Sequence, residues 1–594
     1  MRPALALVFA FATAILHAAA AAEPAPNKAL HALFDREFRN GLDEHPENGT
    51  LLGLPGYDDR WTDASPAAVA RRKARVPRVI AELEGFAPAA LSTQDRISRD
   101  VFLYDLKRHA EQDAIFGALP FGADDTWLPV STMDGPQFTV PYVVKATRFA
   151  TVRDYDNYLK RLEALPAVLG QAEATLRAGI ASGWVAPRET LPRVPAMMDT
   201  FSGEDVTATP LWRPFAAFPA EVPAAQQERI TSAARRTLAG KVHPAFAHLK
   251  KFLAEVYLPA ATQSVAVSSL PGGPAYYSLL ARSSTTTDLT PARIHEIGVA
   301  EVARIRAEMD RIIGALHFQG TFAEFMKFLE TDPRFYFKTP EARLAAYRDI
   351  AKRADAALPP LFATLPRTPY GVRAMEAFEG DNADHYSPGA LDGSRAGFFE
   401  ANVNNLATKP SYEMESVLLH EAVPGHHLQG ARSRELQDLP RFRRTKFYVA
   451  YGEGWALYAE SLGYEMGFYT DPYNHFGTLM NEMLRACRLV VDTGLHSKGW
   501  TRAKAIRYMV DNGAGNEAMV TAEVDRYIVI PGQALGYKIG ELRIKAMREK
   551  AKAALGERFD VRWFHNAILD DGALPLAVLE KRIDEWIASQ KRAP

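Results

Sequence analysis

Apolar positions recur with a helical period along most of the chain. After Thr290, apolar residues mostly three or four apart occur at Ile294, Ile297, Val302, Ile305, Met309 and Ile312, which is the spacing of a helix with one buried face. Thr290 is followed by Pro291, and Thr339 by Pro340, an arrangement typical of a helix start. Similar patterns occur near residues 28–46, 66–83, 93–113, 151–178, 224–256, 411–422, 446–467, 473–496, 501–511 and 533–554. The pattern predicts a mostly α-helical protein.

Strand signals are few. Residues 264–268 alternate around two valines, and residues 397–402 (GFFEAN) follow a turn-rich segment at 387–395. Alternation and flanking turn residues are typical of short strands. We therefore expect a small sheet among many helices.

The N-terminus has the features of a secretory signal. Arg2 precedes an apolar stretch at 4–16 and a run of small residues that ends at Ala22, which matches the three regions of a signal peptide. The apolar stretch is shorter than the roughly 20 residues that span a bilayer, and no cysteine follows it for lipid attachment. We predict a signal peptide at 1–22 and a periplasmic or secreted protein, with no membrane attachment after cleavage.

The rest of the chain is divided by segments rich in proline and glycine. Such segments lie near 117–147, 182–223 and 257–289, and we expect them to connect helical subdomains or to line a cleft. A boundary near residue 285 would separate an N-terminal helical lobe, 23–285, from a C-terminal lobe, 286–594. The candidate chemistry described next lies in the C-terminal lobe.

Charge and cysteine content exclude some functions. The 70 Lys and Arg residues balance 71 Asp and Glu residues, for a net charge of −1, so no large positive field favours nucleic acid. Cys487 is the single cysteine, which excludes an internal disulfide framework and thiolate metal clusters. A metal site would need His, Asp or Glu ligands.

The segment HEAVPGHHLQ, residues 420–429, has the composition of a metal site. It places three histidines within eight residues, with Glu421 directly after His420. In the HExxH motif, one helical turn brings two imidazoles to one zinc ion, and the glutamate acts as general base on the bound water. Here Pro424 occupies the position of the second histidine, so the standard spacing fails.

A break in the helix could restore the site. On an unbroken helix His420 would lie about 9 Å from His426 and about 10 Å from His427 along the axis, too far for a shared zinc at ~2.1 Å per ligand. Pro424 and Gly425 favour a break or bulge at this point. We prefer His426 as the second ligand, with His427 as the alternative. A capped helix whose histidines bind carbonyl groups or solvent is the interpretation without a metal.

A third ligand is available downstream, in the helical segment YGEGWALYAE at 451–460. Its two glutamates, Glu453 and Glu460, are seven residues apart and therefore on one helix face. Gly452 and Gly454 flank the first of them and permit close approach of another helix. Glu453 is the predicted third ligand, and Glu460 is either an alternative ligand or a carboxylate that contacts a ligand histidine.

These motifs resemble those of a known family. HEAVPGHHLQ, EGWALYAE, RLVVDTGLH at 488–496 and RYIVIPGQALGYKIG at 526–540 look like the bacterial domain-of-unknown-function 885 family. That family is grouped with the HExxH metallopeptidase clan, whose mostly helical members include angiotensin-converting-enzyme-like and Taq-carboxypeptidase-like peptidases. The resemblance implies a helical, two-lobed metallopeptidase-like architecture with a small antiparallel sheet beside the zinc helix and a deep cleft.

The resemblance also implies roles for individual residues. His420, His426 and Glu453 would bind Zn²⁺, and Glu421 would be the general base. Further residues would bind substrate, the oxyanion or the ligands. His385 and Tyr386 would lie on a substrate-binding strand, and Asp492 with His496 would form a supporting pair. Tyr527, which follows an arginine as in the converting-enzyme group, would be the donor to the oxyanion, with Tyr537 as the second choice. A plain helix-surface pair is the alternative for Asp492 and His496.

Together these features predict an exported zinc metallopeptidase that hydrolyses short peptides. One alternative is an inactive peptide-binding or metal-binding protein in which Pro424 misplaces the second ligand. Another is a zinc hydrolase of non-peptide amides. The cleavage preference, exo or endo, and the oligomeric state are left open by the sequence.

Overall fold

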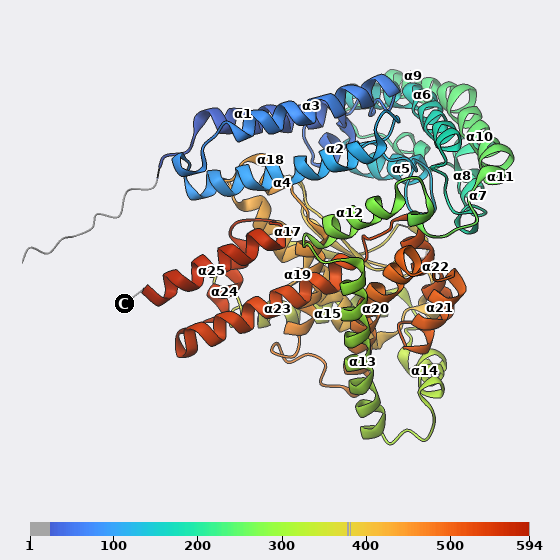
Figure 1. The fold of residues 1–594 in the computed structure, drawn as a ribbon. Coiled ribbons are helices and arrows are strands. Elements are labelled where there is room, and N and C mark those ends of the chain that lie inside the picture. Colours follow the sequence, from blue (N-terminus) through green and yellow to red (C-terminus); the bar gives the residue numbers. More distant parts are fainter. Residues whose placement is uncertain (1–23, 377–378, 381, 392, 593–594) are drawn as a thin grey trace, which may run out of the picture.

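Helices make up most of the regular structure, as the hydrophobic pattern predicts (Figure 1). The computed structural model describes residues 24–376, 379–380, 382–391 and 393–592. The predicted signal peptide at 1–22 lies outside the described residues.

The first part of the chain forms helices α1 (Lys28–Glu44), α2 (Pro46–Leu51), α3 (Pro66–Glu84), α4 (Thr93–Phe116), α5 (Pro136–Ala146), α6 (Val152–Ser182), α7 (Val194–Met197), α8 (Asp199–Ser202), α9 (Ala224–Thr237), α10 (His243–Phe252), α11 (Leu258–Ala260) and α12 (Gly273–Thr285). The second part forms α13 (Pro291–Ala315), α14 (Phe322–Thr331), α15 (Pro340–Ala357), α16 (Met414–Glu421), α17 (His426–Glu435), α18 (Arg441–Arg444), α19 (Val449–Leu462), α20 (Pro472–Ser497), α21 (Arg502–Asp511), α22 (Glu517–Val529), α23 (Leu535–Leu555), α24 (Val561–Leu569) and α25 (Leu576–Arg592).

Every helical segment predicted from the pattern is helical within a few residues. The two predicted helix starts are confirmed in detail. The hydroxyl of Thr290 accepts a hydrogen bond from the backbone N–H of Arg293, and that of Thr339 accepts one from Ala342. Each threonine therefore satisfies a backbone donor that the first helical turn leaves free.

Five α-helices lie within segments that we expected to be irregular, and the two longest of them are α5 and α12. Helix α5 begins with Pro136, and α12 has Pro274 in its first turn after Gly272, whose φ is +69°. The proline and glycine residues that indicated loops are the start signals of these helices, because proline is well tolerated in a first turn.

The sheet is mixed, so the expectation of an antiparallel sheet is wrong in part. Strands β1 (Tyr370–Ala374), β2 (His385–Ser387) and β3 (Gly397–Ala401) are ordered β1-β3-β2. Strands β2 and β3 are antiparallel, whereas β1 and β3 are parallel. The sequence of β1, YGVRA, contains glycine and arginine and only weak alternation, which is why it was missed. The expected strand at 264–268 is also wrong, because this stretch leads into a short 3-10 helix, Val267–Ser269.

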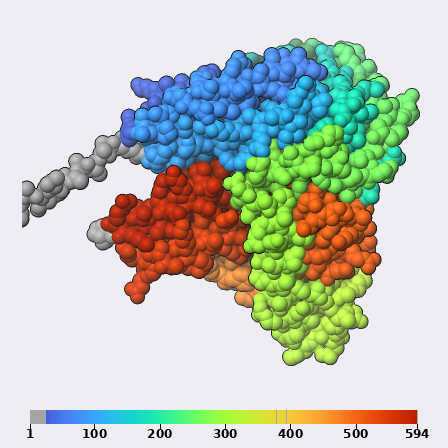
Figure 2. All heavy atoms as spheres, viewed as in Figure 1, coloured from blue at the N-terminus to red at the C-terminus, as the bar shows by residue number. Residues whose placement is uncertain are grey.

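The hydrophobic cores link the two parts of the chain. One cluster of buried side chains is drawn entirely from residues 116–277. A second is built mainly from residues after 340 but includes Ile97 and Val101 of α4. In Figure 2 the blue N-terminal helices lie directly against the red C-terminal ones. The boundary near 285 stays a prediction.

Helices α19, α20 and α23 form the support for the candidate site. Glycines allow α19 and α23 to approach closely: a Cβ atom on Gly454 would lie 2.5 Å from the Cα of Gly540, and one on Gly540 would lie 1.9 Å from the carbonyl oxygen of Ala450. The close approach expected next to Glu453 is therefore present. Within the described part of the chain, no helix combines the length and the apolar character needed to cross a membrane.

Candidate metal centre

The helix that carries His420 is interrupted at Pro424, as predicted. Helix α16 ends three residues before the proline, at Glu421, and α17 starts two residues after it, at His426. The backbone N–H of His427 donates to the carbonyl oxygen of Ala422 across the break, at 3.1 Å. A Cβ atom on Gly425 would lie 1.8 Å from the carbonyl oxygen of His420, so only glycine fits where the two helices meet.

The break brings two histidines together. The ring centroids of His420 and His426 are 4.9 Å apart, with the ring planes nearly perpendicular at 89°. Ligand atoms of these two residues and of Glu421 all lie within 4.8 Å of one another. A separation of about 9 Å on an unbroken helix is thus replaced by direct proximity.

Glu453 completes the group. Its Oε2 atom lies 3.5 Å from Nε2 of His420 and 3.2 Å from Nε2 of His426. Two ligands at 2.0–2.1 Å from a tetrahedral zinc ion are about 3.3 Å apart. The donor types and their spacing therefore fit one zinc ion.

Glu460 orients the first histidine. Nδ1 of His420 lies 2.7 Å from Oε1 of Glu460, which is 3% exposed. With Nδ1 donating to this carboxylate, Nε2 has its lone pair free for a metal. Arg485 lies 3.6 Å from the same carboxylate. The contact matches the supporting role predicted for Glu460.

Titratable side chains are concentrated around His420 and Glu453. Burial lowers the pKa of His420, but hydrogen bonds to Glu453 and Glu460 outweigh it and raise the pKa to about 9. Burial also opposes ionisation of Glu453, yet the nearby His426 and His420 hold its pKa well below the usual range. The negative carboxylates thus favour a cation between them, which a bound metal would supply.

Glu421 faces the same space and is held by the sheet. The backbone N–H of Tyr386, on β2, donates to Oε2 of Glu421 at 2.9 Å. Oε1 of Glu421 lies 4.0 Å from Nε2 of His420. The carboxylate is therefore fixed beside the proposed ligands, and the sheet lies next to the site as expected.

His427, the alternative ligand, makes different contacts. Its Nδ1 lies 3.1 Å from the hydroxyl of Tyr386, and its Nε2 lies 3.1 Å from the carbonyl oxygen of Thr368. Burial lowers its pKa to about 4. Both ring nitrogens are thus occupied by groups other than Glu453, which favours His426 as the second ligand.

The two candidate tyrosines differ in surroundings. The hydroxyl of Tyr527 donates to Glu523 at 2.6 Å and accepts from Arg488 at 3.1 Å. Burial raises the pKa of Tyr537, and the nearby negative charge of Glu453 raises it further. Tyr537 lies on α23, which packs against the helix that carries Glu453, whereas Tyr527 is bonded within a cluster of charged side chains.

Asp492 and His496 do not form the expected pair. Asp492 accepts from the hydroxyl of Tyr277 at 2.6 Å and from the backbone N–H of Gly532. His496 accepts from the N–H of Val267 at Nδ1 and donates from Nε2 to the carbonyl oxygen of Tyr527. Both side chains are fully buried. They hold α20 against neighbouring segments and make no hydrogen bond to the candidate ligands.

His385, another substrate-binding candidate, is partly exposed. Nε2 of His385 is 3.6 Å from Oε2 of Glu379, and the histidine side chain is 29% exposed. Lys145, from α5, pairs with Glu379 and with Glu400 on β3. The N-terminal lobe therefore contacts the sheet near His385.

Several supporting residues were not foreseen from the sequence. The indole N–H of Trp455 donates to the carbonyl oxygen of Pro424 at 2.8 Å, so α19 fixes the break as well as supplying Glu453. Trp455 lies within the EGWALYAE motif, which was the available signal. Arg488 and Glu523 lie on α20 and α22, and only the fold brings them near Tyr537.

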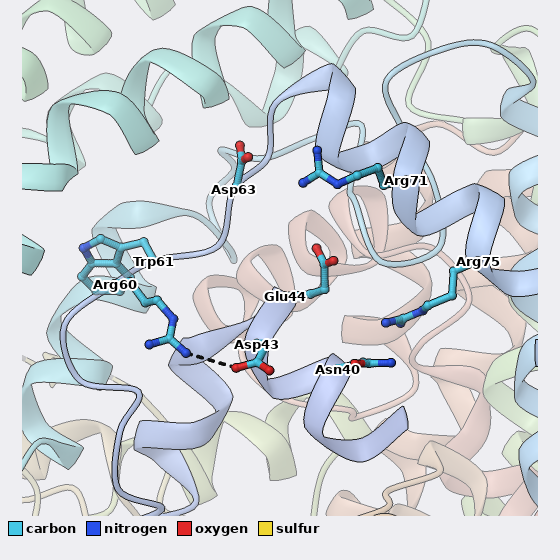
Figure 3. Close-up of a pocket in the computed structure, with 8 residues that line it drawn as sticks. All are labelled: Asn40, Asp43, Glu44, Arg60, Trp61, Asp63, Arg71 and Arg75. Carbon is cyan, nitrogen blue, oxygen red and sulfur yellow. Dashed lines mark hydrogen bonds and ion pairs between the residues drawn. The ribbon is translucent and has the colours of Figure 1, made fainter. Parts of the chain in front are cut away.

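The site is recessed but reachable by solvent. The side chains of Glu421, His426 and Glu453 keep 17%, 15% and 14% exposure. A cavity of about 480 Å³ opens among residues of α1, α3 and the loop that leads into α3 (Figure 3). It shares no residue with the metal group and pairs acidic and basic side chains such as Asp43 and Arg60. Its lining contains none of the residues predicted from the motifs.

Comparisons with known proteins agree with the fold. The family described as "Bacterial protein of unknown function (DUF885)" matches residues 46–583. A solved structure from Colwellia psychrerythraea is 29% identical, with a TM-score of 0.89 over 94% of this chain and 99% of that chain. One from Shewanella oneidensis is 17% identical, with a TM-score of 0.69 over 93% and 99%. Both are described as a "putative lipoprotein". No curated protein matches.

Proposed function

The chain belongs to the bacterial DUF885 family, whose description gives no activity, and we propose from the geometry of its own side chains that it is an exported zinc-dependent peptidase. One observation carries the proposal. Nε2 of His420 and Nε2 of His426 converge on the same oxygen of Glu453, at 3.5 and 3.2 Å. That spacing is the one expected for ligands of tetrahedral zinc.

His420, His426 and Glu453 would hold the ion. A bound zinc ion would polarise the scissile carbonyl group and make a coordinated water more acidic. Glu421 would take the proton from that water and pass it to the leaving amine. Its hydrogen bond from the N–H of Tyr386 keeps the carboxylate aimed at the site during both transfers.

Tyr537 is the better candidate for the oxyanion donor. It lies on α23, which packs against the helix carrying Glu453, whereas the hydroxyl of Tyr527 is already donated to Glu523. One such donor contributes a few kcal/mol to the transition state. The role predicted for Tyr527 stays a prediction that its contacts do not support.

The sheet suggests a peptide substrate. Strand β2 is an edge strand in the order β1-β3-β2, and its residue Tyr386 bonds the proposed base. An exposed strand edge binds an extended peptide through backbone hydrogen bonds. Since the side chains of Glu421, His426 and Glu453 are only 14–17% exposed, we propose short or unfolded peptides as substrates, with folded proteins excluded.

An exported location fits both the predicted signal peptide and the relatives. The two related structures carry the description of lipoproteins, which is a property of those proteins. We propose a periplasmic or secreted location for this chain. Activity in a periplasmic or culture fraction, compared with the cytoplasmic fraction, tests it.

The alternatives are an inactive binding protein and a hydrolase of non-peptide amides. The inactive binding protein requires that Pro424 misplaces the second ligand, and the position of His426 beside Glu453 argues against this. No specific contact favours the hydrolase of non-peptide amides. Peptide hydrolysis remains the function best supported by the site.

The test is hydrolysis of a broad peptide library by the zinc-loaded protein. Glu421→Gln should retain zinc and lose at least about 10³-fold in kcat, because the carboxylate base disappears. Glu330→Gln, an exposed glutamate paired with Lys327, is the control and should match the wild type. Absence of wild-type hydrolysis across the library, with peptide still bound, would instead favour the binding protein.

A further inference from the structure

Two arginines, the buried Arg488 and the partly exposed Arg526, share one carboxylate. Arg488 on α20 donates to Oε2 of Glu523 at 2.9 Å, and Nη1 of Arg526 on α22 lies 3.3 Å from Oε1 of the same residue. Arg488 is only 5% exposed. Two guanidinium groups therefore face one full negative charge, which leaves this cluster with a surplus positive charge.

Donors of this cluster are open to a further acceptor. Nη1 of Arg488 is buried and has no hydrogen-bond partner. The other bonds of Arg526 go to neutral oxygens, those of Gln533 at 2.5 Å and of the Tyr537 hydroxyl at 3.3 Å. Leaving a buried charged donor unpaired is costly, so an anionic ligand would stabilise the cluster. The side chain of Arg526 keeps 16% exposure, which gives such a ligand access.

Tyr537 connects the arginines to the metal group. Its ring lies 4.4 Å from the guanidinium carbon of Arg488 and 5.9 Å from that of Arg526. Tyr537 lies on α23 three residues before Gly540, and the backbone of Gly540 packs against Gly454, the residue after Glu453 on α19. The arginines therefore contact the part of α23 that packs against the helix carrying Glu453.

Other acidic groups nearby do not neutralise the surplus. Glu453 is itself engaged by His420 and His426. Asp492 is held by the hydroxyl of Tyr277 and by the backbone N–H of Gly532, and burial raises the pKa of its carboxyl group.

We propose that Arg526 and Arg488 bind a carboxylate of the peptide substrate, and that the enzyme is therefore selective for short peptides that present a carboxylate at this place. The inference rests on the proposed peptidase function. Guanidinium groups bind carboxylates through paired, charge-assisted hydrogen bonds. The carboxylate has two sources, the free C-terminus of the peptide or an acidic side chain. A C-terminal carboxylate would make the enzyme an exopeptidase.

Binding and hydrolysis are measured separately with fluorescein-labelled tetrapeptides. Three forms are compared: a neutral sequence with a free C-terminus, the same sequence as a C-terminal amide, and an amide with glutamate as its last residue. Binding is measured by fluorescence anisotropy on the zinc-loaded Glu421→Gln variant, so that turnover does not interfere. Hydrolysis is measured on the wild type.

We expect the free acid to bind about 10-fold to 100-fold more tightly than the neutral amide, with a matching preference in kcat/KM. Arg526→Gln should abolish most of that preference, and Arg526→Lys should keep part of it. Arg502→Gln is the matched control. Arg502 is paired with Asp525 of α22, so this variant should leave the preference unchanged.

The outcomes are distinct. Tight binding of the glutamate amide but not of the neutral free acid would identify a side-chain carboxylate as the ligand and exclude exopeptidase selectivity. Equal binding of all three forms, or a preference that survives Arg526→Gln, would overturn the proposal. Acid-selective binding without hydrolysis would support the carboxylate receptor and contradict the peptidase function, so the two failures are separable.

Discussion

Nδ1 of His420 and Oε1 of Glu460 lie 2.7 Å apart, both side chains being almost fully buried. The two residues come from different helices. His420 is on α16, and Glu460 is on α19, two turns beyond Glu453. The same helix thus supplies a proposed ligand and the group that orients another ligand. The contact fixes Nε2 of His420 as the atom that faces Glu453.

Loss of this contact should weaken zinc binding without abolishing it. We expect Glu460→Ala to lower zinc affinity about 10-fold to 100-fold, because the imidazole loses its orientation and basicity. Glu460→Gln, which still accepts a hydrogen bond, should cost less. Competition with a chromophoric chelator measures both. Glu465→Gln is the control, because the Glu465 side chain is 42% exposed and pairs with Arg548. An affinity equal to the wild type in Glu460→Ala would contradict the orienting role.

Gly425 should be intolerant of any side chain. A Cβ atom there would lie 1.8 Å from the backbone oxygen of His420, whereas one on Gly430 would meet only the flexible end of Arg434, at 3.4 Å. We expect Gly425→Ala to lower both the thermal unfolding midpoint and zinc affinity, since α16 and α17 must separate. Gly430→Ala on the same helix should change neither. Similar behaviour of the two variants would show that the break is not held by this contact.

The two neighbouring histidines should separate metal binding from folding. His426→Ala should strongly reduce zinc affinity, because its Nε2 faces Glu453. His427→Ala should retain zinc but lower stability, because Tyr386 and Thr368 lose a buried partner. Zinc titration and thermal unfolding of both variants check this. Loss of zinc only in His427→Ala would reverse the ligand assignment.

Local signals in the sequence were sufficient to predict the helices and the residue types of the candidate metal ligands, because these features depend on neighbouring residues. Thr290 with Pro291 marks a helix start whatever the helix packs against. The choice between His426 and His427 was left open, because it depends on how Gly425 packs on His420, which is a contact between backbones. The spacing of the histidines alone does not determine that contact.

Longer-range features were less accessible. Tyr537 is on the helix that packs against α19 because Gly454 and Gly540 let α23 approach closely, and the sequence does not reveal this pairing. Tyr527 was preferred for its position after an arginine, yet its hydroxyl is bonded to Glu523. Strand β1 was missed because its pairing with β3, rather than its composition, makes it a strand.

Acid should destabilise the fold partly through His496. Burial lowers its pKa from 6.5 to about 4, and the N–H of Val267 points at Nδ1, so the folded protein disfavours the charged imidazole. Because the pKa of His496 is lower in the folded protein than in the unfolded chain, its contribution to the free energy of unfolding is complete above about pH 6.5. That contribution is lost as the pH falls toward 4. The loss amounts to about 3 kcal/mol at the acid end.

The variant His496→Gln isolates this contribution, because glutamine can make both hydrogen bonds and does not titrate. The free energies of unfolding of wild type and variant, measured with denaturant at pH 7 and pH 4, are compared. We expect the wild type to lose about 3 kcal/mol more than the variant between these values. Parallel pH dependence of the two proteins would show that His496 is not buried as a neutral ring.

Zinc content is the most direct test of the metal centre. The wild type, Glu453→Gln and Glu421→Gln are loaded with zinc, dialysed against metal-free buffer and analysed by atomic spectrometry. We expect about one zinc per chain in the wild type and in Glu421→Gln, and a loss of most of it in Glu453→Gln, because only Glu453 shares its oxygen with both histidines. A wild type without zinc, or a Glu453→Gln variant that keeps one zinc per chain, would contradict the account.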